Sequence, residues 1–240
     1  MNLERIMGIL KSAIAIMSIA TAVTACCTTA DRWCSADSWT FEDSSGEAEL
    51  NFIGDTLEIV SPDGLTLWYN ERLQGDYTIE YKACVVMKGG QHDRLSDLNC
   101  FWGAEDPVHP DDIFARSAER SGIFSDYNSL NLFYVGFGGN ENTTTRLREY
   151  HGEFHGIDES KVKPLLQEYT DPAHLLQPNR WYQIRITAQN STTTFSVDGE
   201  QYFHLRTEKG KCDGHFAIRL WKNRVRITDF RISGADCAAK

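Results

Sequence analysis

Residues 179–205, NRWYQIRITAQNSTTTFSVDGEQYFHL, alternate between apolar and polar side chains and include an Asp-Gly pair at 198–199. Alternation with a period of two predicts β-strands over residues 181–188, 193–197 and 202–205. The Asp-Gly pair is typical of a tight turn, because both residues tolerate the backbone angles that turns require. This stretch therefore predicts consecutive antiparallel strands joined by short turns.

The same alternation continues through most of the chain. Turn residues separate the alternating runs at 54–55, 62–64, 89–90 and 138–140. Further strands are predicted over residues 38–42, 48–52, 56–60, 65–70, 77–87, 97–102, 130–137, 144–150, 215–221 and 225–232. About a dozen short strands without a long helix predict an all-β fold of two packed antiparallel sheets, a jelly-roll sandwich.

One domain is expected over residues 38–235, because no internal repeat, low-complexity tract or linker divides them. Two connections, residues 104–125 and 154–179, are longer than a hairpin needs and contain several prolines. Connections of this length in a compact domain often carry function.

Charge and composition exclude one class of partner. The 240 residues carry a net charge of −10, and 41% of them are hydrophobic. Nucleic-acid binding depends on clustered Lys and Arg that release counterions, so this acidic chain is not expected to bind DNA or RNA.

The first residues have the features of a targeting segment. Arg5 and Lys11 precede an apolar run over residues 12–23, which is too short for a stable membrane anchor. The sequence VTAC at 23–26 resembles a bacterial lipobox, which implies a signal peptide over 1–25, lipidation of Cys26 and a tether over 26–37. We expect an outer-membrane lipoprotein, on the periplasmic or the cell-surface side, that contacts the membrane through its lipid anchor only. An ordinary secretory signal is the alternative.

Six cysteines remain once Cys26 is set aside, an even number that permits disulfides in an oxidising compartment. Cys84 and Cys100 lie inside apolar runs and fit buried free thiols equally well. The cysteine and histidine spacing does not indicate a zinc site.

Four segments near the C-terminus resemble the closing strands of concanavalin A-like lectin/glucanase domains. They cover residues 179–186, 195–199, 214–219 and 227–230. The resemblance implies a concanavalin A-like fold and leaves the function open.

A second resemblance covers most of the chain after the targeting segment. Its segments are residues 94–102, 122–130, 134–140, 143–150, 166–171 and 174–176. They are similar to secreted bacterial domains of unknown function related to the YesU-like family. Such domains tend to be encoded beside enzymes that degrade pectin-type, rhamnogalacturonan-like polysaccharides, which implies an acidic polysaccharide or oligosaccharide as the partner.

The hairpin over residues 125–150 is the first candidate for a sugar site. Strand alternation places Arg146, Arg148 and Tyr150 on one face. If that face is concave, its arginines can hold a uronate carboxylate through bidentate contacts. A solvated arginine stripe paired with acidic neighbours is the alternative. The other candidate substrate-binding residues are Arg94, Trp102, Asn128, Asn131 and Tyr134.

These residues permit a β-elimination of uronate polysaccharides, which needs three roles. Arg146 or Arg148 would neutralise the carboxylate, His92 would act as the base, and Tyr127 would donate a proton to the leaving oxygen. His92 is alternatively a solvated loop residue, and Tyr127 a residue that pins the long loop.

Two further functions stay open. A retaining hydrolase needs two carboxylates about 5–5.5 Å apart, and the chain lacks the paired acidic strand motif of glycosidases with this fold, so hydrolysis ranks below elimination. A non-catalytic glycan-binding protein needs only aromatic rings and a few planar hydrogen bonds, and the chain has enough aromatic residues.

No cofactor is expected, and calcium is the one alternative. Asp106, Asp111 and Asp112 offer oxygen ligands in a proline-containing loop, without the regular spacing of a dedicated calcium loop. A solvated acidic loop is the competing interpretation.

Overall fold

The computed structural model describes residues 33 and 35–234. The predicted signal peptide, Cys26 and most of the predicted tether lie outside the described residues. Among the described residues, none of the helices is long and apolar enough to cross a membrane.

The described residues form an antiparallel β-sandwich with few helical turns, as predicted. The strands are β1 (Trp39–Asp43), β2 (Glu49–Ile53), β3 (Thr56–Tyr69), β4 (Tyr77–Val85), β5 (Leu98–Glu105), β6 (Asn131–Gly138), β7 (Thr144–Tyr150), β8 (Leu165–Tyr169), β9 (Trp181–Gln189), β10 (Thr192–Val197), β11 (Glu200–Arg206) and β12 (His215–Ser233). The helical segments are η2 (Ala36–Ser38), η3 (Ile113–Glu119), η4 (Phe124–Ser129), α1 (Gly139–Asn142), η5 (Gly152–Phe154), α2 (Glu159–Val162) and η6 (Pro172–His174).

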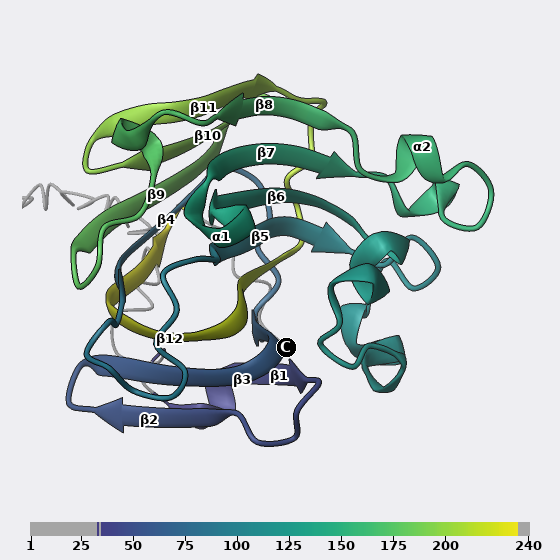
Figure 1. The fold of residues 1–240 in the computed structure, drawn as a ribbon. Coiled ribbons are helices and arrows are strands. Elements are labelled where there is room, and N and C mark those ends of the chain that lie inside the picture. Colours follow the sequence, from purple (N-terminus) through teal and green to yellow (C-terminus); the bar gives the residue numbers. More distant parts are fainter. Residues whose placement is uncertain (1–32, 34, 235–240) are drawn as a thin grey trace, which may run out of the picture.

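Two long strands, β3 and β12, pass through both sheets and connect them. The first half of β12 pairs with β5, and its second half pairs with β4. The sheet that carries the site therefore runs β1-β3-β12-β5-β6-β7-β8, and the other runs β2-β3-β12-β4-β9-β10-β11. Figure 1 shows β5 to β8 side by side, with the short helices that follow β5 and β7 gathered at one end of these strands.

The predicted turn at residues 62–64 is wrong, because these residues lie inside β3. Gly64 pairs with Trp221 of β12. A Cβ atom at Gly64 would lie 2.2 Å from the carbonyl oxygen of Gly122, so glycine here permits a close approach of two backbone segments. The predicted strands at 215–221 and 225–232 likewise join as β12, which bulges at Lys222 (φ 50°).

Strand β8 was not predicted. Leu165, Leu166, Gln167 and Glu168 are all exposed, and their sequence lacks the alternation of apolar and polar side chains that predicted the other strands. Strand β6 has two distinct faces. Phe133, Val135 and Phe137 pack between the sheets, whereas Leu132 and Tyr134 belong to a second cluster on the outer face of the same sheet.

A buried ion pair fastens the long loop that contains η3 and η4 to this outer face. The side chains of Glu42 and Arg120 are only 2% and 3% exposed. Glu42 Oε1 accepts hydrogen bonds from Arg120 Nε (2.9 Å) and Ser117 Oγ (2.7 Å), and its Oε2 accepts one from Trp68 Nε1 (3.0 Å). The loop that borders the site is thereby held to β1 and β3.

The described cysteines, Cys84, Cys100 and Cys212, are buried free thiols. For Cys84 and Cys100 this agrees with the second of the two alternatives that the sequence left open, buried free thiols. Burial raises the pKa of Cys100 to about 12, so this thiol stays protonated at neutral pH.

Candidate functional site

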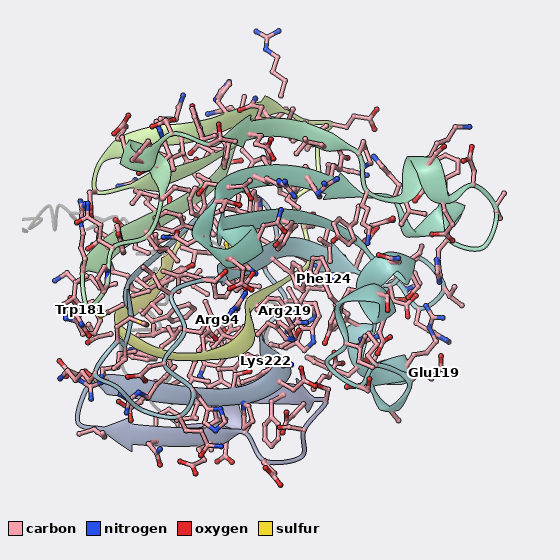
Figure 2. All side chains as sticks on the ribbon, in the orientation of Figure 1. Arg94, Glu119, Phe124, Trp181, Arg219 and Lys222 are labelled. Carbon is pink, nitrogen blue, oxygen red and sulfur yellow. The ribbon has the colours of Figure 1, made fainter. Side chains whose placement is uncertain are left out.

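A pocket of about 610 Å³ opens on the outer face of the sheet, where β12, β5, β6 and β7 lie next to one another. It is lined by Ser44, Asp63, Gly64, Asp97, Asn99, Ile123, Phe124, Tyr134, Gly136, Gly139, Asn140, Thr144, Arg146, Arg148, Lys163, Arg219 and Trp221. Figure 2 shows Arg219 and Phe124 close together over the middle of this sheet, far from Trp181 at one rim of the molecule and Glu119 at another.

Strand register builds the floor of the pocket. Arg219 of β12 lies opposite Asn99 of β5, which lies opposite Gly136 of β6. Gly136 in turn lies opposite Arg146 of β7. Directly opposed residues share a face and have Cβ atoms about 4.5–5.5 Å apart, so these four positions form one row across the sheet.

The glycine in this row makes room for a tyrosine. A Cβ atom at Gly136 would lie 2.4 Å from the hydroxyl oxygen of Tyr134, which places that hydroxyl above Gly136, in the middle of the row. No described residue hydrogen-bonds to this hydroxyl, and only 8% of Tyr134 is exposed. Burial raises the pKa of Tyr134 well above its ordinary value, so the hydroxyl keeps its proton.

Arg219 is a buried cation at one end of the row. The residue is 3% exposed, and its Nη1 donates to the carbonyl oxygens of Leu65 (3.0 Å) and Leu220. Its Nε has no partner, and among the described residues no carboxylate lies within 4.0 Å of the guanidinium. Burial lowers the pKa of Arg219. An arginine stays charged in a protein, so this charge is desolvated with no described carboxylate in contact, and Asp97 attracts it only from beyond 4.0 Å.

Two further cations, Arg148 and Lys163, stand together beside the other end of the row, since Arg148 lies two residues along β7 from Arg146. Arg148 Nη1 donates to the main-chain oxygen of Lys163 (2.6 Å), and Lys163 Nζ donates to Asn128 Oδ1 (3.0 Å). Neither forms an ion pair within 4.0 Å with a described residue. Burial, and then the charge of Arg148, lowers the pKa of Lys163. Glu159 attracts Lys163 from beyond 4.0 Å and acts in the opposite direction on this pKa. An anion bound between Arg148 and Lys163 would relieve their mutual repulsion.

Arg146 differs from these three cations because it is neutralised. Its Nε forms an ion pair with Glu168 of the neighbouring strand β8. The lining carboxylate of Asp97 is likewise paired, with Arg94 at 2.7 Å. Asp63, the other lining acid, accepts a hydrogen bond from Trp221 Nε1 (2.9 Å). The balance of unpaired charge in the pocket is therefore positive, in a chain whose net charge is −10.

Two aromatic rings give the pocket apolar surface. Phe124 lies between the cations, with Lys163 Nζ and the Arg219 guanidinium each 5.5 Å from its ring centroid. Trp221 is 40% exposed and lies beside the pocket opening. Rings in this setting can stack on the apolar faces of sugars, while the cations and amides hold polar groups.

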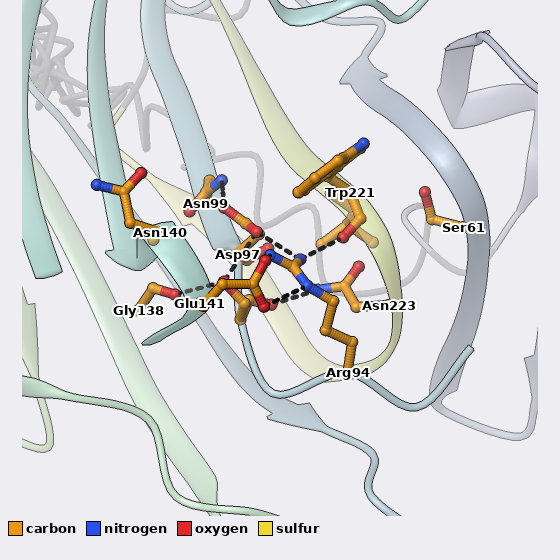
Figure 3. A network of polar contacts seen from close by, with 12 residues as sticks. Ser61, Arg94, Asp97, Asn99, Gly138, Asn140, Glu141, Trp221 and Asn223 are labelled. Carbon is orange, nitrogen blue, oxygen red and sulfur yellow. Dashed lines mark hydrogen bonds and ion pairs between the residues drawn. The ribbon is translucent and has the colours of Figure 1, made fainter. Parts of the chain in front are cut away.

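Arg94 holds the rim of the pocket in place through the contacts that Figure 3 draws. Its guanidinium bonds to Asp97 Oδ2 (2.7 Å), to Glu141 through two contacts (2.6 and 3.0 Å) and to the main-chain oxygen of Trp221 (2.9 Å). The same group lies 4.5 Å from the centroid of the Trp221 ring. One side chain therefore links β12, the start of β5 and the turn between β6 and β7.

The segments that Arg94 links are strained. Asp97, Asn140, Glu141, Asn142 and Lys222 all have positive φ, between 50° and 61°. Such conformations cost roughly 1–3 kcal/mol for each residue outside glycine and persist where the surroundings hold them, most often at functional sites.

Replacing Arg94 by glutamine should loosen Trp221 and the Asn140 turn without removing a ligand contact. We expect the affinity for an acidic oligosaccharide to fall about tenfold, or about 1.4 kcal/mol. Titration calorimetry measures the change, and Arg185→Gln, an exposed arginine paired with Glu80 on the other sheet, is the matched control. Equal losses in both variants would show that Arg94 has no special role at the pocket.

The structure brings together three of the residues singled out from the sequence: Tyr134, Arg146 and Arg148 all line the pocket. Arg94 supports the rim. His92 is partly buried but does not line the pocket, which separates it from the arginines it was expected to assist.

Three other predicted site residues are buried in the protein interior and do not line the pocket: Trp102, Tyr127 and Tyr150. Trp102 is 1% exposed, stacks on Phe133 and donates to Thr193, so it presents no face to a sugar. Tyr127 and Tyr150 are fully buried, and burial raises the pKa of both. Tyr127 pins the long loop against Trp68 and Phe101, which was the alternative interpretation.

The two predicted asparagines hold loops in place. Asn128 Oδ1 accepts from Lys163, and Asn131 Oδ1 accepts from the main-chain nitrogen of Gly152 (2.8 Å). Their contribution to the site is the placement of Lys163 and of the segment after β7.

Sequence reasoning missed Arg219, Lys163, Asn99 and Phe124. Arg219 was assigned to a strand but not to the site. Its alternation with buried apolar residues was visible, yet the strand register that places it beside β5 was not.

Two of the three acids considered as calcium ligands, Asp106 and Asp112, have other partners. Asp106 is fully buried and accepts two hydrogen bonds from Arg116, both 2.7 Å long. Asp112 caps the first turn of η3. Within residues 33 and 35–234, no group of three or more His, Cys, Asp or Glu side chains is arranged to hold a metal ion.

Comparison with protein families gives one match. The model of Domain of unknown function (DUF6250) matches residues 59–230, which is more than half of the chain and includes most of the pocket. The chain belongs to this family. No curated protein sequence gives a significant match. The relation of this DUF6250 domain to YesU-like proteins, and to pectin degradation, stays a prediction.

Solved structures similar to the DUF6250 domain share its fold at low identity. A protein of unknown function with a galectin-like fold from Bacillus subtilis has a TM-score of 0.63 and 17% identity, over 83% of this chain and 90% of that chain. The carbohydrate binding module CBM66 from Bacillus subtilis has a TM-score of 0.52 and 11% identity, over 82% and 96%. A native glycosidic hydrolase has a TM-score of 0.51 and 10% identity, over 83% and 91%. These similarities establish the galectin-like, concanavalin A-like fold.

Proposed function

We propose that this protein recognises an acidic, uronate-containing saccharide in the pocket between β12, β5, β6 and β7. The observation that carries the proposal is the set of cations, Arg148, Lys163 and Arg219, that line the pocket without a carboxylate partner among the described residues. A buried charge is costly unless a counterion compensates it, so a ligand that brings the counterion binds favourably.

The neutral groups of the pocket favour a sugar over a small inorganic anion. The hydroxyl of Tyr134 makes no hydrogen bond to a described residue, and Asn99 Oδ1 has no partner either. Both lie in the row between the cations, where ring hydroxyls can donate to and accept from them. Phe124 and Trp221 add apolar surface of the kind that sugar rings cover.

Two solved structures of the same fold support a saccharide as the ligand class. One is named a carbohydrate binding module and another a glycosidic hydrolase. At 10–11% identity they carry no residue roles to this chain. Pectin and rhamnogalacturonan are the acidic polysaccharides that the sequence resemblance suggests.

Binding alone is the activity that the geometry favours most. His92 does not line the pocket and Tyr127 is fully buried, so neither would reach a bound sugar in the roles first considered for elimination. Both acids that line the pocket already have a partner, since Asp63 accepts a hydrogen bond from Trp221 and Asp97 pairs with Arg94. This arrangement does not favour the pair of acids that hydrolysis needs.

β-Elimination is the second candidate because one proton-bearing group, the Tyr134 hydroxyl, lies unpaired among the cations. In this case Tyr134 would donate a proton to the leaving oxygen, and Lys163 would have to lose its own proton before it could remove the C5 proton. Burial and the charge of Arg148 lower the pKa of Lys163, which favours that loss. The cations would stabilise the charge that develops on the carboxylate.

A lipid anchor at Cys26 would place this pocket outside the cytoplasm, where polysaccharides from the environment arrive. We propose an outer-membrane location on this ground. Mass spectrometry of the mature N-terminal peptide would identify the lipid, and an unmodified Cys26 would contradict the location.

The proposed function is tested by replacing Arg148 with glutamine. The wild-type protein should bind polygalacturonate or rhamnogalacturonan and not a neutral galactan, and the variant should bind about tenfold more weakly, because a charge-assisted hydrogen bond contributes roughly 1.5–3 kcal/mol. Affinity gel electrophoresis or calorimetry gives the values. Arg231→Gln, at an exposed position of β12 where this strand pairs with β4, should bind normally.

The same polymers separate binding from cleavage. Elimination would produce the ultraviolet absorbance of an unsaturated uronate, and Tyr134→Phe would abolish it. Binding without new absorbance or new reducing ends would leave recognition as the function. Equal binding of acidic and neutral polymers would contradict the proposal as a whole.

A further inference from the structure

The unpaired cations of the pocket fall into two groups at different places. Arg219 stands on β12, and Arg148 stands on β7, with β5 and β6 between them. Neighbouring strands lie about 4.8 Å apart, so the backbones of the two arginines are on the order of 14 Å apart. Lys163 belongs to the second group through its contact with Arg148.

The two groups face the same space. Lys163 Nζ and the Arg219 guanidinium each lie 5.5 Å from the centroid of the Phe124 ring, so twice that distance is the largest separation that the two charges can have. Arginine and lysine side chains from opposite sides of the pocket therefore converge on its middle. Asn99 and the Tyr134 hydroxyl lie between them, in the row that crosses the sheet.

The positions of the cations bear on how many negative groups this space can take. Among the described residues, Arg148, Lys163 and Arg219 form no ion pair within 4.0 Å. Arg146 is paired with Glu168, and Arg94 is shared between Asp97 and Glu141. A single uronate at one cationic position would leave the other position without an anion in contact.

We infer that the pocket takes two carboxylates on neighbouring sugar rings, one at Arg219 and the other between Arg148 and Lys163. The inference rests on the proposed function and narrows it to saccharides with consecutive uronates. The hydroxyl groups between the two carboxylates would meet Asn99 and Tyr134, and the apolar face of a ring would cover Phe124. A chain in which neutral sugars alternate with uronates would fill only one of the two cationic positions.

Three disaccharides test the inference by calorimetry: a galacturonate dimer, a rhamnose–galacturonate pair with one acid, and a neutral galactose dimer. We expect the dimer with two acids to bind at least about tenfold more tightly than the pair with one acid, as an added charge-assisted contact implies. The affinity for the dimer with two acids should also fall more steeply as the salt concentration rises.

Lys163→Gln should remove this advantage, so that the two acidic disaccharides bind alike. Lys161→Gln is the matched control, because Lys161 lies on the neighbouring turn, is 60% exposed and pairs with Asp158. Equal binding of both acidic disaccharides to the wild-type protein, each above the neutral one, would overturn the inference and leave the proposed function intact. No preference over the neutral dimer would overturn both.

Discussion

Replacing Arg219 by methionine is expected to weaken binding of an acidic oligosaccharide by at least about thirtyfold, since removing one partner of a buried charged pair costs roughly 2–5 kcal/mol. The free energy of unfolding should change by no more than about 1 kcal/mol or should rise, because an apolar side chain of similar length removes a desolvated charge. Arg219 is 3% exposed and has no carboxylate partner among the described residues. Calorimetry and urea unfolding measure the two quantities.

Arg226→Met is the control for this substitution. Arg226 lies on the same strand, pairs with Glu58 at 2.6 Å and belongs to the half of β12 that pairs with β4. Its replacement should leave binding unchanged. If Arg219→Met bound the oligosaccharide as tightly as the wild-type protein, Arg219 would contribute to the fold and not to binding.

Glu42→Ala is expected to lower the free energy of unfolding by about 3–5 kcal/mol, because it leaves Arg120 buried without its counterion. The substitution also removes the acceptor for Ser117 and Trp68. Urea denaturation provides the measurement, and Glu49→Ala, at an exposed position of β2, should cost far less.

The double variant Glu42→Leu with Arg120→Met separates charge from packing. With both charges gone, it should be more stable than Glu42→Ala, since no buried charge is left unpaired. A loss below about 1 kcal/mol in Glu42→Ala would contradict the role given to this pair, because such a loss is typical of exposed ion pairs.

The sandwich could be predicted from the sequence because burial on one face leaves a period of two in each strand. The predicted runs at 181–188 and 193–197 correspond closely to β9 and β10. The runs in β3 and β12 were divided where each strand passes from one sheet to the other. Pro62 and Gly64 produce the same local signals as a turn, and the polar residues 222–224 interrupt the alternation in β12.

Part of the candidate site could be found by the same reasoning. Arg146 and Arg148 share a face through alternation alone, and Tyr134 joins them because β6 and β7 form one hairpin, in which Tyr134 lies opposite Arg148. Arg219 and Asn99 come from strands far apart in the sequence, and only the pairing register places them in the same row. His92 and Tyr127 were chosen for their chemistry, which does not say whether a side chain points into a pocket or into the core.

The most direct test of the central claim is a crystal structure of the protein with a galacturonate oligosaccharide. Recognition of an acidic sugar by this pocket predicts a uronate carboxylate within hydrogen-bonding distance of Arg219, or of Arg148 and Lys163, with a sugar ring against Phe124. An oligosaccharide bound elsewhere on the protein, or one in this pocket with its carboxylates turned away from these cations, would contradict the claim.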